Sequence, residues 1–309
     1  MSIARTLLLK VSDNQWLREN GTRVPFIRRA VSKFMPGETF EEMIAAARAT
    51  AAEGIASVFT RLGENVRDLG EADAVARHYL EGIDRLRALN LDCEPSIKPT
   101  QLGLDIDREL AYAHLRALAA RAHAANNYLW IDMEQSHYVD VTLTLAKRLR
   151  DEFPGVGVCL QAYLFRTRED LEDITSRGIG VRLVKGAYNE PASVAFPKKT
   201  DVDANYYALA QIMIGPAARA AGSRAVFGTH DLQLIQSIRA HAQTTAVNAA
   251  EYEFHMLYGI QKAAQQRLAN DGAPVRVLIA YGDYWFPWYM RRLAERPANV
   301  WFVAKSLFG

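Results

Sequence analysis

Two adjacent arginines near the end of the chain have the types and the spacing that bind a carboxylate. Arg291 and Arg292 precede Glu295 by about one helical turn, so on a helix this glutamate can pair with either of them. Pairing fixes the rotamer of a long side chain and leaves its other donors for a planar anion, a usual task of arginine. Aromatic neighbours, Trp288 among them, indicate a pocket for a small organic acid with an apolar body. A solvated helical face is the alternative for an isolated arginine pair.

The elements that must position such groups alternate along the chain between short β-prone runs and longer helical stretches. Strands that alternate with helices predict parallel β-α units, and eight units predict an α/β fold, a (β/α)8 TIM-like barrel. A doubly wound sheet is the alternative, but no glycine-rich dinucleotide fingerprint follows any strand. The eight strand candidates are residues 55–60, 91–97, 128–133, 156–162, 180–184, 224–229, 252–254 and 275–280.

The chain divides into two parts of unequal size. Residues 1–54 are interpreted as an N-terminal helical segment packed on the barrel, since Thr39 and Glu42 form a capping-box pattern before an apolar run. Residues 55–309 form the barrel itself, which has an ordinary length for one α/β domain.

The composition excludes several classes of function. The 309 residues include 37 basic and 35 acidic ones, a net charge of +2, which gives no case for nucleic-acid binding. Cys93 and Cys159 lie in apolar runs without a partner motif, which fits a reducing compartment, and neither they nor the histidines show metal-ligand spacing. No stretch approaches the roughly 20 apolar residues of a transmembrane helix. We therefore expect a soluble, cytoplasmic protein without a bound metal.

Polar side chains accompany most of the predicted strands. In a barrel the C-terminal ends of the strands meet at one face, where active sites lie, so we expect these side chains to share one site. Mixed charges at such a site perturb pKa values. A capping role or a structural ion pair is the alternative for any single member. The members are Arg61 and Glu64, Lys98, Asp132 and Glu134, Gln161 and Tyr163, Arg182 and Lys185, Thr229 to Asp231, and Glu253.

Together these motifs resemble the proline dehydrogenase family, the flavin-dependent (β/α) barrel enzymes that oxidise proline. The most specific are Arg-Leu-Val-Lys-Gly-Ala-Tyr at 182–188 and the Arg-Arg-x-x-Glu run at 291–297. The length is similar to that of the bacterial monofunctional type, without an attached aldehyde dehydrogenase domain. The other matching segments, in the family's order, are residues 96–100, 131–134, 160–163, 229–231 and 253–259.

The resemblance implies a clamp for the substrate carboxylate. Lys98, Arg291 and Arg292 would bind the carboxylate. Glu295 would hold Arg292, and Glu64 would pair with Arg291 and close the site.

The resemblance also implies a flavin site. Asp132 would orient Lys98 and occupies a catalytic position, and Tyr188 would pack beside the substrate. Arg182 would lie near flavin N5 and stabilise the electron-rich reduced ring. The residues that would line FAD are Met133, Gln161, Arg182, Val184, Lys185, Gly186, Ala187, Thr229 and His230.

The implied reaction is a step of proline catabolism, the FAD-dependent oxidation of L-proline to 1-pyrroline-5-carboxylate. Hydride would pass from the ring carbon next to nitrogen to flavin N5. The amine must be neutral for that step, so activity is expected to rise with pH. Because no NAD motif is present, a quinone or another acceptor would reoxidise FAD. A quinone acceptor leaves open a peripheral association with the inner face of the membrane.

Two positions depart from the family's pattern, which usually has tyrosine at both. Leu278 stands three residues before Tyr281, and Trp288 stands three residues before Arg291. Leu278 would remove a ring and a hydroxyl from the pocket wall, and Trp288 would add bulk and one donor. Ordinary proline with compensating repacking is one interpretation. The same flavin chemistry on a proline analogue, or on another amino acid in a biosynthetic pathway, is the other.

Functions of other classes are alternatives. A Schiff-base lyase would use Lys98 or Lys185 as an amine nucleophile in the same barrel. A non-catalytic barrel would act as a binding or regulatory module. Both alternatives predict a colourless protein, so the visible spectrum separates them from a flavoenzyme.

Overall fold

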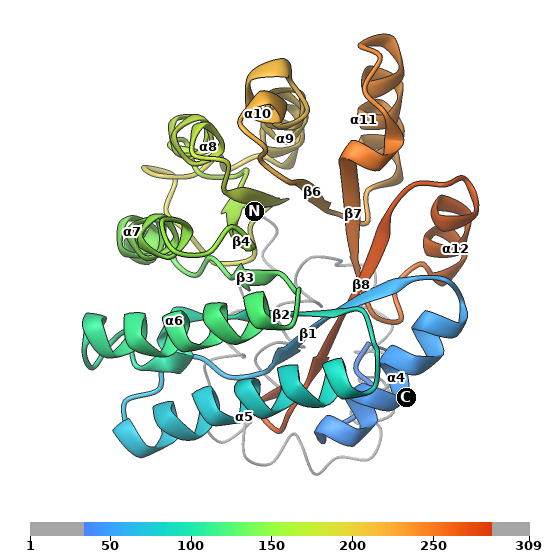
Figure 1. The fold of residues 1–309 in the computed structure, drawn as a ribbon. Coiled ribbons are helices and arrows are strands. Elements are labelled where there is room, and N and C mark those ends of the chain that lie inside the picture. Colours follow the sequence, from blue (N-terminus) through green and yellow to red (C-terminus); the bar gives the residue numbers. More distant parts are fainter. Residues whose placement is uncertain (1–33, 286–309) are drawn as a thin grey trace, which may run out of the picture.

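The computed structural model describes residues 34–285, and these residues form a closed barrel of eight parallel strands in sequence order (Figure 1). Parallel pairing of β1 with β8 closes the ring, so the (β/α)8 prediction is confirmed and the open doubly wound sheet is wrong. The strands are β1 (Ala56–Arg61), β2 (Cys93–Ile97), β3 (Leu129–Ile131), β4 (Val156–Gln161), β5 (Gly180–Val184), β6 (Ala225–Gly228), β7 (Tyr252–Leu257) and β8 (Val275–Tyr281).

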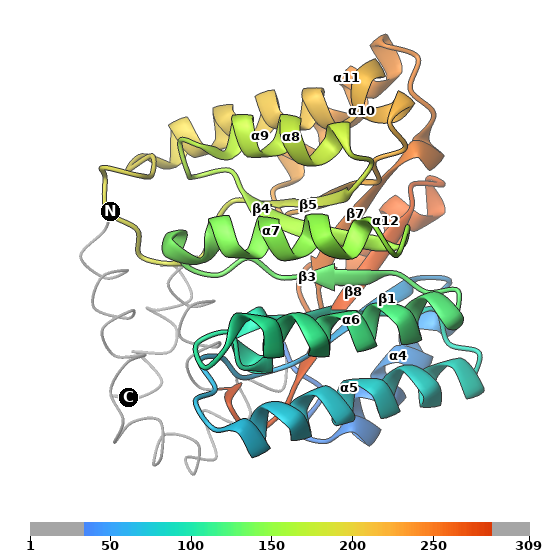
Figure 2. The ribbon, with the colours of Figure 1, turned by 60° about the vertical axis from the view of Figure 1, so that its left-hand side comes forward.

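Helices surround the strands on the outside (Figures 1 and 2). Several begin after an aspartate whose carboxylate accepts N–H groups of the first turn, as Asp68, Asp107 and Asp231 do for α5, α6 and α11. The described helices are α4 (Phe40–Ala52), α5 (Leu69–Ala88), α6 (Arg108–Ala124), α7 (Val139–Arg150), α8 (Thr167–Ser176), α9 (Lys199–Met213), α10 (Pro216–Ala220), α11 (Leu232–Thr244) and α12 (Lys262–Asn270), with 3₁₀ turns η1 (Pro99–Leu102), η2 (Ser136–Tyr138) and η3 (Ala249–Glu251).

Helix α4 covers the outer face of the strands that close the ring. It begins with the predicted capping box, in which Glu42 N donates to Thr39 Oγ1 at 3.3 Å and Thr39 N donates to Glu42 Oε2 at 2.9 Å. Phe40 packs against Phe59 of β1 and Tyr281 of β8, with ring centroids 5.9 and 5.7 Å away. The proposed division of the chain at residue 54 stays a prediction, because residues 1–33 lie outside the described part.

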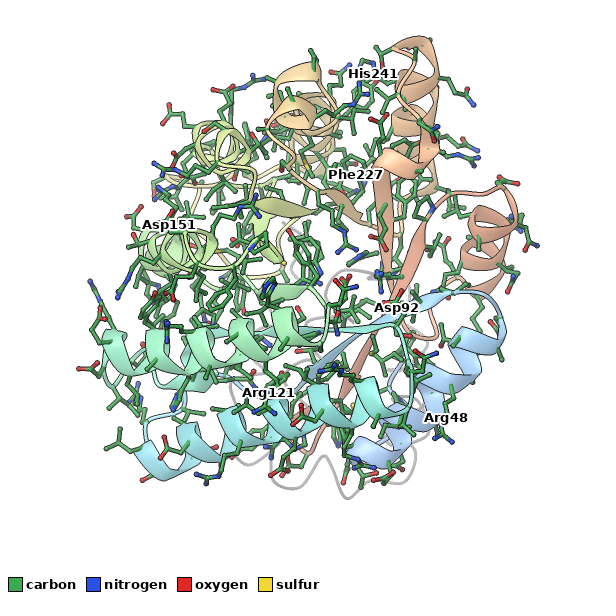
Figure 3. The ribbon with its side chains drawn as sticks, viewed as in Figure 1. Arg48, Asp92, Arg121, Asp151, Phe227 and His241 are labelled. Carbon is green, nitrogen blue, oxygen red and sulfur yellow. The ribbon has the colours of Figure 1, made fainter. Side chains whose placement is uncertain are left out.

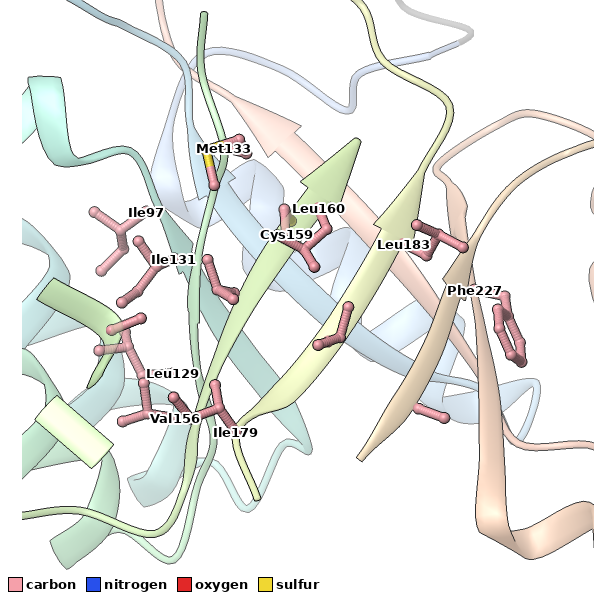
Figure 4. Packing of buried hydrophobic residues seen from close by; sticks show 14 of the residues in the cluster. Ile97, Leu129, Ile131, Met133, Val156, Cys159, Leu160, Ile179, Leu183 and Phe227 are labelled. Carbon is pink, nitrogen blue, oxygen red and sulfur yellow. The ribbon is translucent and has the colours of Figure 1, made fainter. Parts of the chain in front are cut away.

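Apolar residues pack on both faces of the barrel. The larger cluster lies between the strands and the helices, and Figure 4 shows part of it, including Ile131 and Leu183. A small second cluster lies inside the ring, where Val58, Trp130 and Val226 meet. Side chains alternate between the two faces along each strand, so Trp130 points inward while its neighbour Ile131 points outward.

Buried charges fill the barrel interior at the N-terminal ends of the strands. Glu94 accepts from Arg224 Nη1 at 2.8 Å and from Trp130 Nε1 at 2.7 Å, and it lies 3.3 Å from Arg276 Nη2. Arg276 also pairs with Asp92, labelled in Figure 3, at 2.5 and 3.0 Å. The charges compensate one another, which is the condition for burying them.

Glu253 belongs to this N-terminal layer, so the expectation that it joins the site at the other end is wrong. It is the second residue of β7 and pairs with Arg224 and with Arg276 Nε, the latter at 2.9 Å. The predicted strand covered residues 252–254 only, which put Glu253 close to its C-terminal end. Pairing with β8 extends β7 to Leu257, which leaves Glu253 near the beginning of the strand.

We expect Glu94→Ala to lower the free energy of unfolding by about 3 kcal/mol, because Arg224 and Arg276 then lose part of their buried compensation. Urea denaturation followed by circular dichroism measures the change. Glu172→Ala is the control, since Glu172 forms an exposed pair with Arg168 at 3.7 Å and its loss matters little. Equal effects of both substitutions would contradict a stabilising role of the layer.

Candidate active site

A buried arginine occupies the C-terminal half of the barrel interior. Arg182, in the middle of β5, is 3% exposed. Its guanidinium pairs with the carboxylate of Asp132 and donates to Ser96 Oγ at 2.6 Å. Its Nε donates to Cys159 Sγ at 2.9 Å, and Cζ lies 5.1 Å from the centre of the Trp130 ring. The expected proximity of Asp132 and Arg182 is therefore direct contact between the two side chains.

The environment of Asp132 keeps its carboxylate charged. Burial by itself would raise its pKa, but the positive charges of Arg182 and Lys98 and the hydrogen bonds from Ser96 and Cys159 hold the pKa below its ordinary value. Ser96 Oγ donates to Asp132 Oδ1 at 2.8 Å, and Cys159 Sγ donates to the same oxygen at 3.4 Å. Asp132 is therefore a negative hydrogen-bond acceptor at neutral pH.

Lys98 lies at the same level of the barrel as Asp132. It follows β2 directly and is 9% exposed. The backbone N–H of Asp132 donates to Ile97 O at 2.8 Å, which fixes the end of β3 against the end of β2. The positive charge of Lys98 contributes to the lowered pKa of Asp132.

Glu134 is a second buried carboxyl group near Lys98. Thr100 donates to it through its backbone N–H at 3.1 Å and through its hydroxyl at 2.6 Å. Burial is the main effect and raises the pKa of Glu134 to about 7, although Thr100 and Lys98 oppose the shift. The backbone oxygen of Glu134 accepts from Gln161 Nε2 at 3.1 Å, so this group also positions Gln161.

Among the buried polar atoms without a hydrogen-bond partner within residues 34–285, two belong to side chains expected to line FAD. They are Arg182 Nη1 and Gln161 Oε1, one a donor and the other an acceptor. Buried polar groups of native proteins nearly always have a partner. The two atoms therefore indicate a bound ligand that offers both an acceptor and a donor.

The loop after β5 contains the predicted Lys-Gly-Ala segment. Gly186 has φ +113, and a Cβ there would lie 2.3 Å from Cδ1 of Tyr163, so only glycine fits beneath that ring. Lys185 Nζ donates to Asp203 at 2.5 Å and to Asp231 at 2.7 Å. The ammonium expected to approach an anion is therefore already balanced by two carboxylates, and sequence reasoning missed both pairings.

The segment after β6 connects to the neighbouring strand. Thr229 Oγ1 accepts from Asp231 N at 3.1 Å, and His230 Nε2 accepts the backbone N–H of Leu257 at 2.8 Å. A neutral His230 ring therefore carries its proton on Nδ1. These contacts make Thr229 and His230 part of the rim formed by β6 and β7.

The remaining predicted residues are placed as follows. Leu278 of β8 packs against the inner cluster of Val58, Trp130 and Val226, so it forms part of the inner wall of the barrel. Met133 is buried, while four others are partly buried after or at the end of strands: Glu64, Val184, Ala187 and Tyr188.

The predicted carboxylate clamp lies outside the described residues. This applies to Arg291, Arg292 and Glu295, and also to the atypical Trp288. Their roles therefore stay predictions.

Comparison with known protein families identifies the family of the chain. The family model described as proline dehydrogenase matches residues 43–305 of the chain. The chain belongs to the proline dehydrogenase family. Membership identifies it as a dehydrogenase.

Several relatives match this proline dehydrogenase family member over most of its length. Proline dehydrogenase 1 of Bacillus subtilis subsp. natto is 34% identical over 307 residues, 98% of each chain. Proline dehydrogenase of Deinococcus radiodurans is 34% identical over 280 residues, 89% of each chain. These matches are of the bacterial monofunctional type.

A solved structure shares the barrel fold of the family. The crystal structure of proline utilization A (PutA) from Bdellovibrio bacteriovorus, inactivated by N-propargylglycine, matches with a TM-score of 0.81 at 20% identity. The match covers 94% of this chain and 36% of that one.

Within residues 34–285, no helix is both long and apolar enough to cross a membrane, and no group of three or more His, Cys, Asp or Glu side chains is placed to hold a metal ion.

Sequence reasoning missed three residues that surround Arg182 in this proline dehydrogenase family member. Ser96, Trp130 and Cys159 each lie two residues before a predicted site residue, respectively Lys98, Asp132 and Gln161. Side chains two apart on a strand share a face. Examining the position two residues before each predicted site residue would have found all three.

We expect Glu134→Gln to flatten the pH dependence of stability. Burial raises the pKa of Glu134 to about 7, so folding favours the protonated carboxyl and stability is lost as pH rises through that value. Wild type should lose up to roughly 3 kcal/mol of unfolding free energy from this group between about pH 4 and about pH 8. Urea denaturation across that range measures the difference from the variant. Parallel curves for wild type and variant would contradict a raised pKa.

Proposed function

We propose that this chain oxidises L-proline to 1-pyrroline-5-carboxylate with FAD as the hydride acceptor. The observation that carries the proposal is the buried Arg182, whose Nη1 has no partner within residues 34–285, beside the charged Asp132 and Lys98. Membership of the proline dehydrogenase family supports the same reaction.

The residues at the C-terminal end of the barrel fit a flavin. A flavin ring offers hydrogen-bond acceptors and an N–H donor, which complement Arg182 Nη1 and Gln161 Oε1. When bound, FAD supplies the ring that takes up the hydride. The residues proposed to hold it are Met133, Gln161, Arg182, Val184, Lys185, Gly186, Ala187, Thr229 and His230.

The charged side chains have distinct roles in the proposed site. Lys98 binds the substrate carboxylate, and Asp132 orients the ammonium of Lys98 because the two opposite charges lie at one level of the barrel. Arg182 places a fixed positive charge next to the position where electron density increases in the transition state. Arg291 and Arg292, with Glu295 and Glu64 as their partners, complete the carboxylate clamp, and Tyr188 packs beside the substrate.

Leu278 favours an apolar substrate ring and keeps the proline analogue as a second candidate. It packs with Val58 and Val226 on the inner wall, where it offers no hydrogen bond to a ring hydroxyl. Proline itself or an analogue with an apolar substituent fits this wall better than a hydroxylated proline.

The Schiff-base alternative is less compatible with the contacts of Lys185. Such a nucleophile needs a nitrogen lone pair. Lys185 Nζ instead donates to two carboxylates, Asp203 and Asp231. Borohydride in the presence of substrate would trap a covalent adduct if a lysine formed an imine.

The visible spectrum of the purified protein tests the proposal directly. We expect a yellow protein whose flavin absorption bleaches when proline is added without oxygen, and turnover with a quinone or a dye acceptor. A panel of proline analogues and open-chain amino acids ranks the substrates by kcat/KM. A colourless protein would contradict the proposal, and a higher kcat/KM for an analogue would select the second candidate.

We expect Asp132→Asn to lower kcat/KM for proline by about two orders of magnitude, because Lys98 and Arg182 lose their shared negative partner. Steady-state assays normalised to flavin content measure the loss. Asp271→Asn is the control, since it removes a carboxylate from an exposed pair with Arg239. Similar kinetics for the two variants would contradict the role of Asp132.

We expect kcat/KM for proline to rise with pH between about pH 6 and about pH 9, because the neutral amine is the reactive form. Asp132 does not limit this rise, as its pKa is held below the ordinary value and it is already charged. Initial rates across the range measure the profile. A rate that falls steadily over the same range would contradict hydride transfer from the neutral amine.

A further inference from the structure

The guanidinium of Arg182 is held along one edge only. Arginine carries five N–H donors, on Nε, Nη1 and Nη2. In this chain Nε donates to Cys159 Sγ, and Nη2 donates to Ser96 Oγ and Asp132. Nη1 has no partner within residues 34–285. All the partners therefore lie along the Nε–Nη2 edge, and Nη1 is left to donate to a ligand.

Asp132 alone would not select this orientation. Its contact with the guanidinium runs from Nη2 to Oδ1 only, and a single contact lets the guanidinium turn about it. Cys159 engages Nε, and Ser96 engages Nη2. A rotation of the guanidinium about its contact with Asp132 would break the contacts with Cys159 and Ser96.

Ser96 and Cys159 also hold Asp132, because each accepts from the arginine and donates to the aspartate. Ser96 Oγ donates to Asp132 Oδ1 at 2.8 Å and Cys159 Sγ at 3.4 Å. Only a group with both a proton and lone pairs can do this, as a hydroxyl or a thiol does. Burial raises the pKa of Cys159 to about 12, so its sulfur keeps the proton at neutral pH.

These contacts are shielded from solvent and come from separate strands. Ser96 is 0%, Cys159 5% and Arg182 3% exposed. The three side chains belong to β2, β4 and β5, and the Trp130 ring of β3 lies against the guanidinium. Water therefore cannot replace a lost contact without entering the barrel.

We propose that Ser96 and Cys159 are positioning residues that hold the Nε–Nη2 edge of Arg182 beside Asp132, so that Nη1 meets the flavin. This inference rests on the proposed function for the identity of the ligand. The two residues act together. Cys159 accepts from Nε and Ser96 accepts from Nη2, and losing either hydrogen bond lets the guanidinium rotate.

Cys159→Ala, Cys159→Ser and Ser96→Ala test the proposal. Cys159→Ala removes the acceptor for Nε, and Cys159→Ser restores a group that both accepts and donates. We expect Cys159→Ala and Ser96→Ala each to lower kcat per bound flavin about tenfold while KM for proline changes less than about twofold. Cys159→Ser should recover most of kcat.

Flavin binding gives a readout that does not depend on turnover. Fluorescence titration of the apoprotein should show about tenfold weaker FAD binding for Cys159→Ala and a value near that of wild type for Cys159→Ser. The absorption maximum of bound flavin should shift in the alanine variants and return in Cys159→Ser. Unchanged affinity, spectrum and kcat in both alanine variants would overturn the proposal.

Cys93→Ala is the matched control for the cavity that the alanine leaves. Cys93 is the other buried cysteine, and it lies on the opposite face of β2 from Glu94 and Ser96, away from Arg182. It should lose stability to a similar extent but keep the kcat and FAD affinity of wild type. Equal losses of kcat and FAD affinity in Cys93→Ala and Cys159→Ala would overturn the positioning role.

The proposed function and the positioning role fail in different ways. If proline does not reduce the wild-type flavin, the proposed substrate is wrong, and the FAD affinities of the variants still test the position of Arg182. If wild type oxidises proline and the alanine variants match it in every readout, only the positioning role is wrong. Should Cys159→Ala not fold, Ser96→Ala and Cys159→Ser decide by the same measurements.

Discussion

A guanidinium buried inside a barrel must be compensated, and Asp132 compensates Arg182. The requirement determines what surrounds the pair. The hydroxyl of Ser96 and the thiol of Cys159 contact both Arg182 and Asp132. The indole ring of Trp130 lies against the guanidinium. Because Nε and Nη2 of Arg182 are engaged, Nη1 is the nitrogen that we propose meets a ligand. Structural compensation and the proposed chemistry therefore use the same residues.

Trp130 connects this site to the charged layer at the other end of the barrel. Its indole N–H donates to Glu94, while its ring lies against Arg182. Val58 and Val226 pack beside it and separate the two charged groups with apolar atoms. The charged N-terminal layer thus holds Trp130 in place beneath Arg182. The C-terminal ends of the strands remain available for function, as in other barrels of this type.

Closure of the ring explains one success of the sequence-based predictions, and tertiary contacts explain two of their errors. Asp132 and Arg182 came together as expected, since each lies in or directly after a parallel strand of a closed ring. Glu253 was misplaced because its strand continues past the apolar run through pairing with β8. The partners of Lys185 were missed because Asp203 and Asp231 belong to elements that only folding brings close. No local pattern in the chain encodes such pairs.

The sequence by itself determined the family and the alternation of strands and helices, and it predicted polar residues of the candidate site, because periodicity and motifs are properties of neighbours along the chain. Only the tertiary structure decided which charges stabilise the N-terminal layer and which form the site. It also showed that Ser96 and Cys159 join Arg182 to Asp132. The physical reason is that hydrogen-bond partners are selected by distance and angle between strands, and closure of the ring sets both.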